Sequence, residues 1–414
     1  MKNYFSDLNL ANINMFCYLV SLLYLSYFHP FNIRFHLFFL TTGLLTSLHK
    51  KESNQNIFER GDIFLFSTLL LSIFFFFLKL GVLQSSFYWN DFAKLFLRAF
   101  IIPLATFSYI SSYISNKNSI YLLRNFFIFL LLITTIVAIF QYFKIYFAWH
   151  MRLALNTDEL STDPRMESLF IYRDHPMGLA YYSITYSYQM LIGIAAIFSC
   201  LIAKKTKHIF IYSTILWLGL VLTFSKSAIT GIFISFLTVK KNILSKKKNV
   251  IFLFAIIASI ILYLLLSSAF TLSNILATRF YHLRVGLKVI LDNPYGIGVT
   301  DYAIFSSPIF QQFIIPGLDI QQENVHNAYL FPIIKFGWIA ILPIIILIFL
   351  VVKRIKKVKV SSLVFWYFFM IYFTSYAFHI FFHNAGPFSG DHMFWIMFAY
   401  MAASLKVFKR ENGA

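Results

Sequence analysis

Long apolar runs recur along almost the whole chain, and this pattern constrains the fold more than any other feature. Most runs are long enough to cross a hydrocarbon core of roughly 30 Å, which takes about 20 helical residues. Because backbone N–H and C=O groups in lipid must pair within the protein, each run is expected to be a helix. A transmembrane β-barrel shows short alternating segments instead, which the sequence lacks. The chain is therefore predicted to be an all-α polytopic membrane protein.

Composition supports this fold class. The 414 residues are 59% hydrophobic and 12% charged, whereas charged residues make up about 25% of an average soluble domain. Cys17 and Cys200 both fall inside apolar runs, where we expect small core side chains rather than a disulfide. The first ten residues are polar, and no cleavage site follows the first apolar run, so no cleavable signal peptide is expected.

About twelve transmembrane helices are predicted, in one integral membrane domain that spans residues 1–414. Their expected ranges are 11–29, 31–48, 63–83, 91–114, 120–143, 178–203, 208–223, 226–239, 250–270, 326–352, 360–382 and 391–406.

Basic clusters mark alternate connections between these helices. They include Lys50–Lys51, Lys204–Lys207, Lys240–Lys248 and Lys353–Lys359, together with Lys406, Lys409 and Arg410 near the end of the chain. By the positive-inside rule these connections and both termini are expected in the cytoplasm. The net charge of +19 is thus explained by orientation in the membrane, and no nucleic-acid partner is predicted.

This topology leaves large outer segments at 144–177 and 271–325, the second between the ninth and tenth helices, and a shorter one at 383–390. Basic residues on the outer side run against the charge rule, so each needs a reason. For Arg152, Arg165 and Lys288 we expect solvated loop charges or snorkelling side chains.

Three outer positions favour a functional interpretation. Lys226 lies in a tight turn between two apolar runs, Arg284 opens an amphipathic stretch, and His326 begins the tenth predicted helix. Arginine and lysine bind phosphate oxygens, and histidine can accept a proton near neutral pH. Together they suit an anionic, lipid-linked substrate. The alternative is that His326 only caps its helix or hydrogen-bonds the loop.

The motifs around these residues resemble those of the bacterial O-antigen ligase/O-antigen polymerase superfamily. His326-Asn327, nine further residues and Gly337 are similar to the family's H-N-x9-G signature. The stretch from Arg284 to Pro294, with Gly296-x-Gly298, resembles its arginine- and glycine-containing outer loop. Residues 223–228, Thr-Phe-Ser-Lys-Ser-Ala, resemble its T-x-S-R-[ST]-A turn. The stretch from Tyr172 to Pro176, which contains Arg173, occupies the place of a basic outer loop in some ligases.

Two positions depart from the family pattern. The arginine usual in the short turn is Lys226 here, which keeps the charge but loses the bidentate fork. Position 288, where an aromatic residue is usual, is also lysine.

The resemblance implies transfer of a glycan from undecaprenyl pyrophosphate to a hydroxyl at the periplasmic face of the inner membrane. The acceptor is a lipid A-core sugar for a ligase. In this interpretation His326 is the catalytic base, and Arg284 and Arg279 hold the pyrophosphate with Lys226 and Arg173. Possible support comes from Asn327 and from Lys94 and Arg98, which are four residues apart on one helix face. No carboxylate cluster is present, so neither a metal nor another cofactor is predicted.

Other functions remain open at this stage. An O-antigen polymerase, which joins lipid-linked repeat units, shares the same motifs. A protein O-oligosaccharyltransferase is less favoured, because such chains usually carry additional C-terminal sequence. A secondary transporter is disfavoured, since the two halves show no repeat and no carboxylate falls in the middle of a predicted span.

Overall fold

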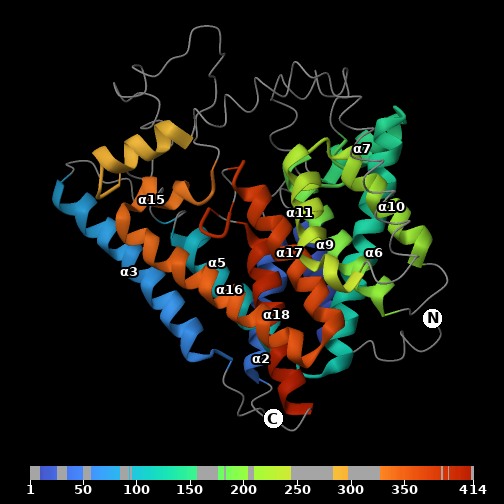
Figure 1. Cartoon of the computed structure of the whole chain (residues 1–414), viewed down its shortest axis with the longest axis horizontal. Coiled ribbons are helices and arrows are strands. Elements are labelled where there is room, and N and C mark those ends of the chain that lie inside the picture. The colour runs from blue at the N-terminus through green and yellow to red at the C-terminus, as the bar shows by residue number, and fades with distance from the viewer. Residues whose placement is uncertain are drawn as a thin grey trace, which may run out of the picture.

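The computed structural model describes residues 10–25, 35–49, 57–83, 93, 96–155, 176–180, 183–203, 209–243, 283–296, 327–383, 386–389 and 391–411. This part of the chain is helical and contains no strand, as predicted (Figure 1). Its elements are α1 (Leu10–Tyr24), α2 (Phe35–His49), α3 (Arg60–Leu83), the π-helix η1 (Leu97–Ile101), α5 (Ile102–Tyr113), α6 (Lys117–Tyr142), α7 (Tyr146–Leu155), α9 (Ser183–Ile202), α10 (Ile209–Leu222), α11 (Lys226–Ile243), α15 (Leu330–Phe336), the 3-10 turn η3 (Trp338–Ala340), α16 (Ile341–Ser361), α17 (Leu363–Ile380) and α18 (His392–Glu411). Residues 283–292 form a further helix.

Four helices of the described chain are long and apolar enough to cross a membrane: Lys117–Tyr142, Ile184–Ile202, Trp338–Ser361 and Leu363–Ile380. Shorter apolar helices occur at Leu10–Tyr24, Phe35–Thr46, Ile209–Leu222 and Lys226–Val239. The predicted span 250–270 lies outside the described residues. The membrane character of the chain is therefore supported, while the count of twelve stays a prediction.

The tenth predicted helix, 326–352, is wrong as a single element. Asn327 precedes a short helix, α15, which ends before Gly337. Gly337 has a φ of 80°, a conformation that a helix does not use and that glycine adopts without steric cost. The chain therefore turns through η3 before the long helix α16 begins.

The last two helices form the centre of the bundle (Figure 1). α17 packs against α9, α11 and α16, while α18 packs against α5 and α16. A glycine allows α11 and α17 to approach closely: a Cβ added at Gly231 of α11 would lie 2.7 Å from the carbonyl oxygen of Ser375 in α17. Such small residues let helices approach closely in membrane proteins. The position of α11 relative to α17 is thereby fixed.

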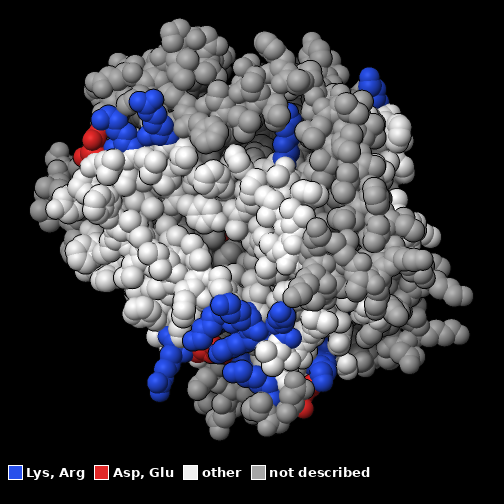
Figure 2. Space-filling view, viewed as in Figure 1, with Lys and Arg blue, Asp and Glu red and all other residues white. Residues whose placement is uncertain are grey.

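Charge is distributed unevenly over the molecule. Figure 2 shows lysine and arginine side chains gathered at one end, where α16 and α18 finish in Figure 1. α16 carries the predicted Lys353–Lys359 cluster, and the last turn of α18 carries Lys409 and Arg410. We call this end of the bundle the basic end. α17 starts where α16 stops, so its C-terminus points to the opposite end.

One ion pair near the basic end is buried. Arg354 of α16 contacts the Asp62 carboxylate of α3 at 2.5 Å, and the two side chains are 3% and 0% exposed. Glu59, which is 40% exposed, lies 3.7 Å from the same guanidinium. The guanidinium also stands over the ring of Phe398 in α18 at 4.7 Å. This contact set ties α3 to α16 and α18.

Asp62→Asn should destabilise the folded protein strongly, because it leaves the buried Arg354 charge without its main partner. Breaking one side of a buried pair typically costs about 3–5 kcal/mol. Thermal unfolding of the purified protein in detergent measures the effect. Lys117→Ala is the control, since its pair with Glu411 is exposed and such pairs contribute at most about 1 kcal/mol. Equal stability of both variants would contradict the role given to the buried pair.

Candidate active site

The predicted turn at residues 223–228 is present between α10 and α11. Phe224 adopts a φ of 50°, which is uncommon for a residue other than glycine. The Thr223 hydroxyl accepts a hydrogen bond from the Ser225 N–H at 3.1 Å, and the Ser225 hydroxyl accepts one from the Ala228 N–H at 3.3 Å. Ser225 thus caps α11. Lys226, half-buried, is the first residue of that helix, where the helix dipole is positive.

Two histidines at the C-terminal end of α17 contact this turn. The Ser227 hydroxyl lies 2.8 Å from Nδ1 of His379 and 3.1 Å from Nε2 of His383. On its other side His379 places Nε2 3.0 Å from the hydroxyl of Ser187 in α9. His379 is fully buried. The turn with Lys226 is therefore joined through Ser227 to the end of α17.

The H-N segment contacts the same end of α17. The Asn327 side-chain amide donates to the Phe381 carbonyl at 3.1 Å, and the Ala328 N–H donates to the Ile380 carbonyl at 3.1 Å. The Asn327 Oδ1 in turn accepts hydrogen bonds from the N–H groups of Tyr329 and Leu330 at the start of α15. Asn327 is 3% exposed. His326 itself lies outside the described residues, and its predicted role as base stays a prediction.

The third motif packs on the glycine that closes the H-N-x9-G signature. The Trp338 N–H donates to the Pro294 carbonyl at 2.9 Å, and its indole N–H donates to the Ile290 carbonyl at 3.2 Å. A Cβ at Gly337 would lie 2.5 Å from the Pro294 oxygen, and one at Gly296 would lie 2.3 Å from the Lys335 oxygen. Both glycines have positive φ. The two segments can approach this closely only because neither position carries a side chain.

The helix at 283–292 carries Arg284 near its start. Val285 and Val289 are buried on one face, while the Arg284 side chain is exposed. Lys288 is half-buried and pairs with Asp292 at 3.4 Å, which agrees with the surface role expected for it. The packing of residues 290–296 on Trp338 and Gly337 attaches this helix to the end of the H-N-x9-G stretch.

The remaining predicted site residues make no described contact with the motifs above. Arg98 is exposed in the π-helix η1. Arg279, Arg173 and Lys94 lie outside the described residues, as does Arg165. Whether they face the turn with Lys226 stays a prediction.

The expectation of a solvated charge at Arg152 was wrong. Arg152 of α7 is fully buried, and its Nε donates to the Ala180 carbonyl at 3.2 Å. The nearby loop is held by the Gln141 side chain, which accepts from the N–H groups of Met177 and Gly178. A basic residue on a short amphipathic helix gives no sequence signal for such burial, because its spacing equally fits a solvated face.

Sequence reasoning also missed the polar cluster beside the two histidines. The Tyr188 ring of α9 lies 4.5 Å from the His379 ring, and the Tyr376 hydroxyl donates to Asp391 at 2.5 Å. Burial raises the pKa of the Asp391 carboxyl, against the lowering effect of its hydrogen bonds. A signal did exist: His379 and His383 are one turn apart at the end of an apolar run.

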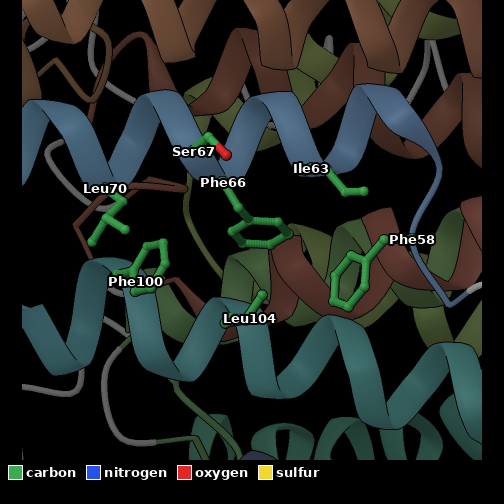
Figure 3. Close-up of a pocket in the computed structure, with 7 residues that line it drawn as sticks. All are labelled: Phe58, Ile63, Phe66, Ser67, Leu70, Phe100 and Leu104. Carbon is green, nitrogen blue, oxygen red and sulfur yellow. The ribbon is translucent and has the colours of Figure 1, made fainter.

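A groove elsewhere on the surface has a different character. Phe58, Ile63, Phe66, Ser67, Leu70, Phe100 and Leu104 line a space of about 210 Å³. It lies between α3 and α5, and Ser67 supplies its one polar side chain (Figure 3). Such a lining offers neither a charge nor a base for group transfer. Among the described residues no group of three metal-ligating side chains occurs either.

Comparison with known proteins adds one finding to this geometry. Residues 211–345 match the family model described as O-antigen ligase. The predicted resemblance to this superfamily is confirmed over these residues, and the family implies glycosyl transfer with lipid-linked glycans in general. No curated protein matches the chain.

The matched region contains all three motifs, but it ends before α17. His379 and His383 therefore belong to a part of the chain beyond the family match, as does Ser187 in α9. Two of the motifs, the turn with Lys226 and the pair Asn327-Ala328, contact residues that follow the matched region.

Gly337→Ala should abolish or strongly reduce glycan transfer, because the added Cβ meets backbone atoms that cannot move independently and the φ of 80° is strained for alanine. The polysaccharide made by a strain that carries the variant is the measurement. Gly193→Ala is the control: the nearest neighbour of its Cβ is a flexible Leu131 side-chain carbon at 3.1 Å, inside helix α9. Normal transfer by Gly337→Ala would show that the loop contact is dispensable.

Proposed function

We propose that this protein is an O-antigen ligase, which transfers a glycan from undecaprenyl pyrophosphate to a lipid A-core sugar hydroxyl at the periplasmic face of the inner membrane. The observation that carries the proposal is that the turn with Lys226 and the pair Asn327-Ala328 both contact the C-terminal end of α17, in a chain whose residues 211–345 match that family. The arginine-containing loop packs on Gly337, at the end of the H-N-x9-G stretch. The orientation is supported by the basic end on the other side of the bundle, which the positive-inside rule assigns to the cytoplasm.

The donor's pyrophosphate is assigned to the cations of the motifs. Lys226 stands at the positive end of α11, so its charge and the helix dipole attract the same anion. Arg284 is exposed on a helix that packs on Trp338, and its guanidinium can bind phosphate oxygens in a bidentate manner. Arg279 and Arg173 are the further candidates for this role. Positive charge at the leaving group stabilises the transition state without proton transfer to it.

The proposed reaction is a single displacement at the anomeric carbon. The acceptor hydroxyl forms a new bond to that carbon while the bond from the carbon to the pyrophosphate oxygen breaks, and the electron pair leaves with the lipid pyrophosphate. The hydroxyl proton passes to His326 as general base. Asn327, fixed by its bonds to α17 and α15, sets the start of this segment.

An O-antigen polymerase uses the same donor and differs in its acceptor, which is a second lipid-linked repeat unit. The family match does not separate the two activities, so a product analysis has to do so. A secondary transporter is disfavoured, because the family match points to group transfer.

Substitutions at Lys226 and Arg284 should change the rate of glycan transfer to different extents. Lys226→Arg should keep glycan transfer, whereas Lys226→Ala and Arg284→Lys should lower its rate about tenfold or more, since hydrogen bonds to charged groups contribute about 1.5–3 kcal/mol. The measurement is the initial rate in membranes that contain each variant. Lys288→Ala, on the same helix as Arg284, is the control, because the Lys288 side chain pairs with Asp292.

If both Lys226→Ala and Arg284→Lys keep the full transfer rate, other side chains bind the pyrophosphate. Arg173, Arg279 and the Lys94/Arg98 pair would then be the next positions to substitute.

Deletion of the gene distinguishes ligase from polymerase. Loss of a ligase should leave lipopolysaccharide with a bare core, while full-length polymer accumulates on undecaprenyl pyrophosphate. Loss of a polymerase should leave cores that carry one repeat unit, because ligation continues without extension. Gel analysis of lipopolysaccharide and extraction of the lipid-linked glycan give the answer, and we expect the bare core. A core with a single repeat would assign the alternative activity.

A further inference from the structure

Two imidazoles lie close together where α17 ends: His379 is in its last turn, and His383 follows three residues after its last residue, Ile380. The ring centroids of His379 and His383 are 4.4 Å apart, and both rings contact the Ser227 hydroxyl of α11. His379 is 0% exposed within a helix that is apolar enough to span a membrane. An ionisable group in such a place is costly and points to function.

The hydrogen bonds around His379 and His383 have one consistent direction. The Ser187 hydroxyl donates to the Ile184 carbonyl at 2.6 Å, so its oxygen is left to accept from Nε2–H of His379. Neutral imidazole has one donor and one acceptor nitrogen. Nδ1 of His379 therefore accepts the proton of the Ser227 hydroxyl. The Ser227 oxygen is then left to accept from Nε2–H of His383.

This chain of bonds holds a turn that is strained by itself. Phe224, three residues before Ser227, has its φ at 50°, and such a conformation persists only where surrounding contacts fix it. Ser227 also lies one helical turn from Gly231, where the backbones of α11 and α17 pack closely. Ser227 follows Lys226 in the sequence. The bonds that hold the Ser227 hydroxyl therefore also hold the first turn of α11, from which the Lys226 side chain extends.

We propose that His379 and His383 are positioning residues for glycan transfer, which act through Ser227 on Lys226. The inference rests on the proposed function, in which Lys226 contacts the donor pyrophosphate. It adds two residues outside the three motifs and outside the matched region to the machinery of the site.

Paired amide substitutions test the direction of the bonds. The Asn amide reaches the place of Nδ1 of histidine, and the Gln amide reaches the place of Nε2. At position 379 the bond to Ser227 uses Nδ1, so His379→Asn should retain more transfer than His379→Gln. At position 383 the bond uses Nε2, so His383→Gln should retain more than His383→Asn. A role in filling space predicts Gln as the better substitute at both positions, since it is nearer to histidine in size.

Removal of the bonds gives the size of the effect. His383→Leu and Ser227→Ala should each lower the transfer rate roughly 10- to 100-fold, the range expected when a buried partner is left unsatisfied. Combined with Lys226→Ala, His383→Leu should cause little further loss, because residues that act through one group are not additive. His150→Leu, an exposed histidine of α7, is the matched control.

The experiment measures initial rates in membranes from the deletion strain that carry each variant. Its substrates are the lipid-linked glycan extracted from that strain and lipopolysaccharide with a bare core, or lipid-linked repeat units alone. The opposite amide preferences at 379 and 383, together with non-additivity with Lys226→Ala, support the inference. If the wild-type protein transfers glycan but the variants keep its rate, or lose rate only according to side-chain size, the inference is refuted and the proposed function is not. Wild-type protein without glycan transfer refutes the proposed function, and the inference with it.

Discussion

The carbonyl groups at the C-terminal end of α17 are the constraint on which the candidate site depends. The last carbonyls of a helix have no partner within it, and in an apolar bundle they must find one. Here the Tyr329 hydroxyl donates to the Ala377 carbonyl, and the segment Asn327–Ala328 donates to the carbonyls of Ile380, the last residue of α17, and of Phe381, which follows it. A requirement of the backbone thereby fixes the H-N motif in place. The same helix end presents the imidazoles that hold the turn with Lys226.

The bundle uses its charges in two separate ways. At the basic end, lysines and arginines of α16 and α18 lie on the surface, where they suit orientation in a membrane. Arg354 in the same helix is turned inward and paired with Asp62, so one member of the cluster stabilises the fold. At the opposite end the described cations are fewer, and each is attached to a defined element. Lys226 begins α11, Arg284 lies on the helix at 283–292, and Arg152 is buried beside Ala180.

Much of this could be predicted from the sequence, because long apolar runs have one solution in lipid. The helical class and the turn at residues 223–228 follow from local pattern. The break at Gly337 could not be separated from a continuous apolar helix, since its cause is contact with Pro294, which is distant in sequence. The roles of His379 and Arg152 were missed for a similar reason. Burial and partners from other helices decide what these side chains do, and neither appears in the spacing of one segment.

The lysine at position 226 can be understood from its surroundings. The family pattern has arginine there, whose fork binds two phosphate oxygens, whereas lysine is a point charge on a flexible stem. A point charge gains from being held in one place, because less conformational entropy is then lost on binding. The cap by Ser225 and the bonds of Ser227 to two imidazoles hold the first turn of α11 from two sides. The structure around Lys226 thus supplies rigidity where the side chain itself supplies none, and the helix dipole adds to its charge.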